Sequence, residues 1–175
     1  MGDEWKKDLE ESNRAFIDCV WPIIKDVCGG GGIKPVEMIE DNSLAKDMDL
    51  KCGIDIWQTI DGKGCRGIAS RVQWGKNWGT FTVRKRRFSG AKTEYEKRKE
   101  AIKNGSYVYP YLTCQAYIEK ETFSLHGGAV ARTSDIFKTI ERGLYKTRQT
   151  TNASFFAVDF EDVENAQEFN ATGMK

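Results

Sequence analysis

The chain has few of the residues that zinc sites and histidine-based catalysis require. Its 175 residues include one histidine, His126, and five cysteines without a Cys-x-x-Cys pair. A structural zinc site needs four nitrogen or sulfur ligands, usually paired in sequence, so the composition argues against one. A Ser-His-Asp triad would depend on His126, which stands before Gly127-Gly128 in a turn-like context. We expect reduced cysteines that pack as small apolar residues.

A long apolar run is also missing. No stretch approaches the roughly 18 apolar residues that span a bilayer. The first residues, Met-Gly-Asp-Glu-Trp-Lys-Lys, lead into an amphipathic segment rather than the apolar centre of a signal peptide. We therefore expect a cytoplasmic protein that makes no membrane contact.

Charges are balanced overall but segregated along the chain. The formal net charge is +1. Nine Lys or Arg stand against three Glu between Thr80 and Lys103, whereas residues 159–168 hold five acids and no base. This segregation favours a localised anion-binding surface over general affinity for polyanions. A solvated charged face is the alternative.

The first third of the chain predicts a long helix and then a series of strands. Apolar residues recur every three or four positions over Trp5–Val27, and Pro22 should split this helix near Val20–Trp21. A weak strand is expected over Val36–Glu40. Three further strands should form a meander: Leu50–Ile60, Cys65–Trp74 and Thr80–Arg87. Asp61-Gly62 should form the tight turn between the first two.

The remainder predicts alternating helices and strands. Thr93-x-x-Glu96 is a capping box that should open a helix to Lys103. Three more elements follow: a strand over Tyr107–Glu119, a helix over Asp135–Arg142 and a strand over Asn152–Asp159. We expect one α+β domain over 1–175, with a core at 5–120, an appended helix and strand at 121–163, and a loosely ordered tail at 164–175.

Polar residues in the first two strands of the meander can meet on one face. Side chains alternate along a strand, so Ala69, Arg71 and Gln73 share a face. If the hairpin pairs the two strands, Asp55 faces Arg71. A carboxylate and a cation in this arrangement suit phosphodiester hydrolysis. They equally suit an ion pair that holds two strands together.

The order helix, three strands, helix, strand resembles the core of the PD-(D/E)XK nuclease superfamily, also known as the restriction-endonuclease-like fold. Gly53-Ile54-Asp55 corresponds to the Asp motif, and Ala69-Ser70-Arg71 occupies the place of Glu-x-Lys. The chain departs from the pattern: Ile54 replaces proline, Ala69 replaces the acid, and Arg71 replaces lysine. The loss of the acid removes a metal ligand, and an arginine cannot act as a base at ordinary pH.

The resemblance implies a set of roles. Asp55 would bind Mg²⁺ or Mn²⁺, helped by Glu10 of the first helix or by Asp49. Asp49 would share the strand face of Asp55 by parity, or would belong to a solvated strand entry. Arg71 would stabilise developing charge, and Gln73 would position water or metal. Many such nucleases dimerise, so a homodimer is a further expectation.

The third strand ends in a run of cations, Arg84-Lys85-Arg86-Arg87. Alternation would send Arg84 and Arg86 to one face, and Lys85 and Arg87 to the other. Contacts from such residues to phosphates give salt-sensitive affinity. Trp78, in a glycine-flanked turn, is the best candidate to stack on an unpaired base.

These features predict a metal-dependent DNA endonuclease. Two alternatives stay open: a catalytically inactive nucleic-acid-binding module of the same fold, and a protein-interaction factor of a phage or mobile element. DNA is the expected partner, and nothing in the sequence excludes RNA.

Overall fold

A seven-stranded mixed sheet forms the centre of the computed structural model, which describes residues 4–39, 43, 45, 47–60, 62–105 and 108–175. The strand order is β1-β2-β3-β5-β6-β9-β10. Only β3 and β5 pair in parallel, and every other pairing is antiparallel. The strands are β1 (Gly32–Pro35), β2 (Ile56–Ile60), β3 (Gly64–Trp74), β5 (Leu112–Ile118), β6 (Leu125–Arg132), β9 (Gln167–Asn170) and β10 (Gly173–Met174).

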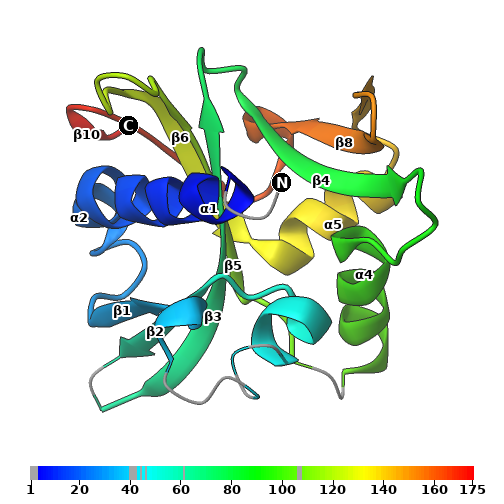
Figure 1. The fold of residues 1–175 in the computed structure, drawn as a ribbon, viewed down its shortest axis with the longest axis horizontal. Coiled ribbons are helices and arrows are strands. Elements are labelled where there is room, and N and C mark those ends of the chain that lie inside the picture. The colour runs from blue at the N-terminus through cyan, green and yellow to red at the C-terminus, as the bar shows by residue number, and fades with distance from the viewer. Residues whose placement is uncertain (1–3, 40–42, 44, 46, 61, 106–107) are drawn as a thin grey trace.

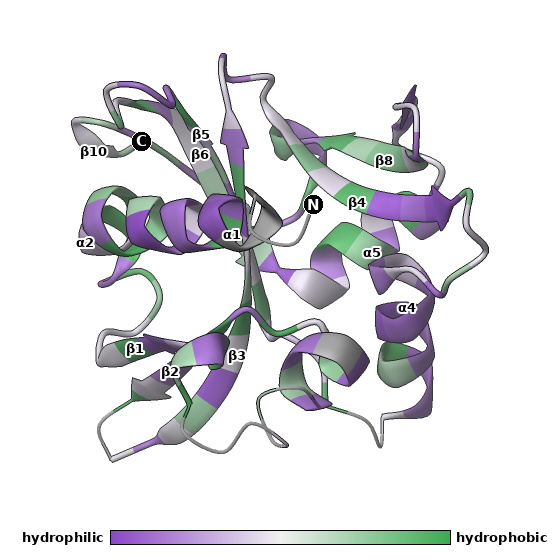
Figure 2. Ribbon diagram, in the orientation of Figure 1, coloured by the Kyte–Doolittle hydropathy of each residue, from purple (hydrophilic) through white to green (hydrophobic). Residues whose placement is uncertain are grey.

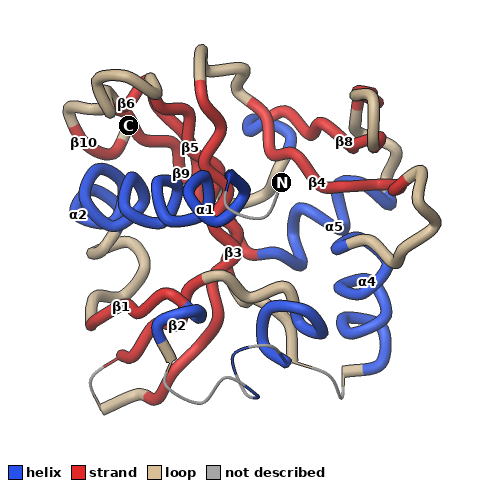
Figure 3. The backbone as a smooth tube through the Cα atoms, in the orientation of Figure 1, coloured by secondary structure: helices blue, strands red, loops and turns tan. Residues whose placement is uncertain are grey.

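A second sheet of three antiparallel strands has the order β4-β8-β7. Its strands are β4 (Thr80–Arg87), β7 (Lys146–Gln149) and β8 (Ala153–Asp159). Figure 3 shows β4 turning away from the end of β3 and running beside β8. The expected three-stranded meander is therefore wrong in its third member, because β4 pairs with β8 and not with β3.

Helices cover both faces of the large sheet, which makes the chain a mixed α+β structure, as predicted. On one face lie α1 (Glu4–Ala15), the π-helical turn η1 (Phe16–Val20) and α2 (Trp21–Ile24). Toward the other side lie α4 (Glu94–Asn104) and α5 (Thr133–Glu141), near the small sheet (Figure 1). Within the described part of the chain, no helix is long and apolar enough to cross a membrane.

The expected break in the first helix lies where proline requires it. Pro22 has no N–H to donate, and α2 begins at Trp21 with this proline in its first turn. The Trp21 N–H bonds back to the Phe16 carbonyl, five residues earlier. The π-helical turn thus absorbs the change of register.

Side chains of β5 alternate between two cores. Ala116 and Ile118 belong to the core beneath α1, η1 and α2, together with Phe16. Tyr117 belongs to the core between the large sheet, the small sheet and α5. All seven residues of β5 are buried, as expected for a strand covered on both faces.

Two expected strands need correction. The strand predicted over Leu50–Ile60 begins only at Ile56, because Asp47–Cys52 forms a π-helical turn, η3. In the predicted strand Val36–Glu40, residues Val36–Met38 form a 3₁₀ turn, η2, while β1 precedes it. Glu40, Asp61 of the predicted tight turn and Tyr107 of a predicted strand lie outside the described residues.

The C-terminal segment 164–175, expected to be a loose tail, instead contributes two strands to the large sheet. β9 pairs with β6, and β10 pairs with β9. Phe169 of β9 is fully buried in the core beneath the first helix. The appended region 121–163 likewise holds more than one helix and one strand, since it supplies β6, β7 and β8.

The burial of Phe169 makes the segment essential to stability. We expect Phe169→Ala to lower the free energy of unfolding by about 3–5 kcal/mol, because it leaves a cavity in a closed core. Phe88→Ala is the matched control: Phe88 is 48% exposed, and its loss should change stability by less than about 0.5 kcal/mol. Urea denaturation measures both. Equal midpoints for the two variants would contradict the packing of β9.

Candidate functional site

Asp55 lies at the point where β2 separates from β3. The backbone N–H of Asp55 donates to the carbonyl of Ile68 (3.1 Å). Two residues further along β3, the Ser70 N–H donates to Asp55 Oδ2 (2.8 Å). The carboxylate therefore takes the place of a backbone acceptor where the β2 ladder ends, so Asp55 has a structural role whatever else it does.

A cleft of about 350 Å³ opens beside Asp55, between β3, β4, α4 and the segment η3 to β2. We call it the basic cleft. Among the described residues its lining includes three acids, Asp49, Asp55 and Glu94. It also includes five bases: Arg71, Arg84, Arg87, Lys97 and Arg98. The bases outnumber the acids, so the described lining of the cleft carries a net positive charge.

Glu94, at the start of α4, joins the two sheets through the cleft. Its Oε1 lies 3.3 Å from Nη1 of Arg84 on β4, and its Oε2 lies 3.7 Å from Nη1 of Arg71 on β3. Burial alone would raise the pKa of Glu94, but Arg71, Arg98 and the two β4 arginines outweigh it and hold the pKa below its usual value. Glu94 thus stays ionised and keeps the guanidinium groups together.

Arg98 forms part of the inner wall. It is only 6% exposed, and its Nη2 donates to the carbonyl of Gly53 (2.8 Å). Gly53 has φ +66°, and a Cβ there would come within 3.2 Å of Arg98 Nη2, so glycine permits the approach. Arg98 Nε is buried and has no hydrogen-bond partner among the described residues.

The environment of Asp55 changes its proton affinity. Burial has the largest effect and raises the pKa of its carboxyl group to about 7. Arg98 and the hydrogen bond from Ser70 oppose this rise, while Glu94 and Asp49 add to it. Asp55 can therefore gain or lose a proton near neutral pH.

A β-bulge changes which cations of β4 face the cleft. Arg84 pairs with Phe155 and Arg86 with Ser154, so Lys85 has no opposite residue on β8. The extra residue resets the alternation, and Arg84 and Arg87 both line the basic cleft. The expectation that Arg84 and Arg87 lie on opposite faces is wrong for this reason. Figure 2 shows the hydrophilic end of β4 near the hydrophilic α4.

The other cations of the run point elsewhere. Lys85 is exposed and lies 5.0 Å from the ring centre of Phe156. Arg86 is exposed and does not line the basic cleft.

Trp78 lies before the start of β4, at the opposite end of the strand from Arg87. The residue is 47% exposed and lines a different cavity, and Lys76 Nζ lies 4.0 Å from the centre of its ring.

Of the remaining predicted site residues, Asp49 lines the cleft, whereas Gln73 and Glu10 do not. Asp49 lines the cleft, but from η3 rather than from the strand of Asp55. Gln73 lies further along β3, beyond the lining residues. Glu10 is exposed on α1, whose Leu9 and Ser12 reach the cleft instead.

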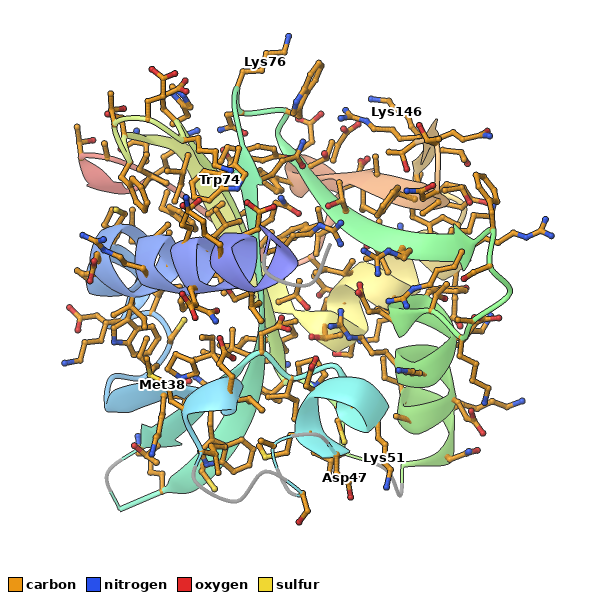
Figure 4. All side chains as sticks on the ribbon, in the orientation of Figure 1. Met38, Asp47, Lys51, Trp74, Lys76 and Lys146 are labelled. Atoms are coloured by element: carbon orange, nitrogen blue, oxygen red, sulfur yellow. The ribbon has the colours of Figure 1, made fainter. Side chains whose placement is uncertain are left out.

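The outer side of η3 carries an ion pair. Asp47 lies 2.8 Å from Lys51, and both side chains project from the outer side of the turn (Figure 4). Asp47 therefore does not contribute to the cleft.

Three side chains of α4 line the cleft, Glu94, Lys97 and Arg98, and the sequence did not predict them as site residues. Glu94 and Arg98 are one turn apart, which is the only signal in the sequence that they share a face. Their partners Arg71, Arg84 and Gly53 come from three distant segments.

The described residues do not fit a tightly held Mg²⁺ or Mn²⁺. Such ions prefer several carboxylate oxygens. No group of three or more potential ligands among His, Cys, Asp and Glu occurs among the described residues. Asp55 and Asp49 share the cleft, but the charges of Arg71 and Arg98 act on the same space. The dependence on metal remains a prediction from the sequence.

Comparisons with protein families, with curated proteins and with solved structures found no match to this chain. The assignment of the cleft therefore depends on its own chemistry.

The raised pKa of Asp55 should appear in the pH dependence of stability. An unfolded aspartate titrates near pH ~4. Between about pH 4 and 7 the folded protein binds more protons at Asp55 than the unfolded chain, so this residue lowers stability as the pH rises through that window. Asp55→Asn keeps an acceptor for Ser70 without the charge. We expect its stability relative to wild type to increase from pH 5 to pH 8 in urea denaturation.

Asp47→Asn is the control for that measurement, since it removes an exposed charge outside the cleft. A difference between Asp55→Asn and wild type that stays constant from pH 5 to pH 8 would contradict the assignment.

Proposed function

We propose that the protein binds nucleic acid by placing backbone phosphates in the basic cleft. The observation that carries this proposal is the convergence of five cationic side chains from β3, β4 and α4 on one opening, against three acids. Arginines present planar forks of donors that match phosphate oxygens. Contacts of this kind bind the backbone without reading the sequence.

A buried donor without a partner supports an anionic ligand. Arg98 lines the cleft, and its Nε is buried and has no partner among the described residues. A buried donor of this kind favours a ligand that brings an acceptor.

The arrangement of strands is compatible with a restriction-endonuclease-like core, which we retain as a proposal. Three features are compatible with the order on which the resemblance depends. They are the β2–β3 hairpin, the parallel pairing of β3 with β5, and the place of α4 between β3 and β5 in the sequence. The departure of β4 to a second sheet is a feature of this chain.

Hydrolysis of the bound phosphodiester is the second candidate function. Asp55, with a pKa of about 7, can transfer a proton at neutral pH. Arg71 lines the same cleft, and its guanidinium can stabilise the charge that develops on a phosphate. Binding remains the first proposal, because the cationic lining supports it without a catalytic group.

The β-bulge supplies a matched pair of variants for the binding test. Arg87→Gln removes a charge from the cleft, whereas Arg86→Gln removes one from its exposed neighbour. We expect Arg87→Gln to weaken binding of DNA and RNA oligonucleotides and to reduce the slope of log K against log salt by about 0.7–0.9. Fluorescence anisotropy at several salt concentrations measures both quantities.

Arg86→Gln should have the smaller effect on affinity and slope. If the two variants lose affinity equally, the charge of the strand matters and the cleft does not. If wild type binds neither DNA nor RNA, the proposal fails, and a protein-interaction factor becomes the better account.

The hydrolysis candidate requires a cleavage assay on linear and branched DNA, with Mg²⁺, with Mn²⁺ and with a chelator. If it holds, Asp55→Asn and Arg71→Gln should each lose cutting, while oligonucleotide binding by Asp55→Asn persists. Cutting that is unchanged in Asp55→Asn would refute the role of this residue. No cutting by wild type under any condition would leave the binding function alone.

A further inference from the structure

A second cavity adjoins the basic cleft at the end of β4. It has a volume of about 360 Å³ and shares two walls with the cleft, the side chains of Arg84 and Arg87. We call it the end pocket. An anion held by these two arginines would therefore lie at the border of both cavities.

The lining of the end pocket differs from that of the cleft. Its other walls are formed by two aromatic side chains, by Ala153 and by three polar side chains: Phe88, Phe155, Ala153, Ser89, Thr150 and Asn152. No acid or further base is among its described lining residues. Aromatic surface combined with a few hydrogen-bonding groups suits a flat heterocycle with polar edges.

The two phenylalanines have different surroundings. The Phe155 ring lies 5.1 Å from the guanidinium of Arg71 and 5.7 Å from that of Arg84, so it makes cation–π contacts with both. Phe88 follows directly after Arg87, and the residue is 48% exposed. Its backbone N–H donates to the carbonyl of Asn152 (3.2 Å), which fixes it beside the β7–β8 turn. Phe88 thus offers a ring face on a fixed backbone.

We infer that the end pocket binds an unpaired nucleobase, stacked on Phe88, of the strand whose phosphate lies on Arg84 and Arg87. This inference rests on the proposed nucleic-acid binding and adds a preference for single strands. A base next to its own bound phosphate can enter the pocket only when it has left the helical stack, which costs energy in a duplex. Stacking on an aromatic ring accepts any base, because every base has a π face.

The test compares oligonucleotides that differ only in their bases. Full-length protein is titrated into a labelled oligodeoxythymidine, into a strand of equal length made of abasic residues, and into the matching duplex. We expect the base-bearing strand to bind about tenfold more tightly than the abasic strand. The duplex should bind more weakly than the oligodeoxythymidine.

Phe88→Ala tests the position of the base. Since Phe88 is half exposed, the variant should fold, and circular dichroism checks this. We expect it to lose most of the advantage of the base-bearing strand while it binds the abasic strand as wild type does. Trp78→Ala is the control, because Trp78 is an equally exposed aromatic residue at the other end of β4.

Each outcome separates the two proposals. Equal binding of base-bearing and abasic strands by wild type would overturn the base pocket and leave phosphate binding intact. Loss of the difference in Trp78→Ala rather than in Phe88→Ala would also overturn it. Absence of binding to every strand would overturn both proposals.

Discussion

One carboxylate holds the two sheets of this protein together at the basic cleft. Glu94 contacts Arg71 of the large sheet and Arg84 of the small sheet at the same time. Charges taken out of water are costly unless they are paired, and here the arginines outnumber the acid that pairs them. This surplus of positive charge is the basis of the proposed phosphate binding. A phosphate would supply the missing negative charge.

Asp55 combines two demands on one side chain. Its Oδ2 completes the hydrogen bonding of β3 at Ser70, where the neighbouring strand turns away. The same position is desolvated enough to raise its pKa to about 7. A carboxylate at the end of a strand ladder is therefore sufficient to explain its place in the fold. Because this pKa lies near neutral pH, Asp55 is also the candidate for proton transfer in the proposed hydrolysis.

Local signals in the sequence predicted local structure well. Pro22 divided the first helix at Val20–Trp21, and the capping box Thr93–Glu96 opened α4. The span of β4 matched its prediction, and β3 began one residue early. These features depend on neighbours within a few residues, namely a missing N–H, a reciprocal cap and the alternation of a strand. Asp55 and Arg71 line one cleft, as expected, but Asp55 lies just before β2 and not within the paired strand on which the expectation rested.

The sequence alone determined the α+β class, most of the element positions and the basic character of one strand. Only the tertiary structure decided that β4 joins β8, that residues 167–174 complete the large sheet, and that α4 supplies Glu94 and Arg98 to the cleft. Strand partners depend on which apolar faces meet across long stretches of chain, and no local pattern encodes that choice. A single bulged residue, Lys85, was enough to exchange the faces of Arg86 and Arg87, because side chains alternate with a period of two.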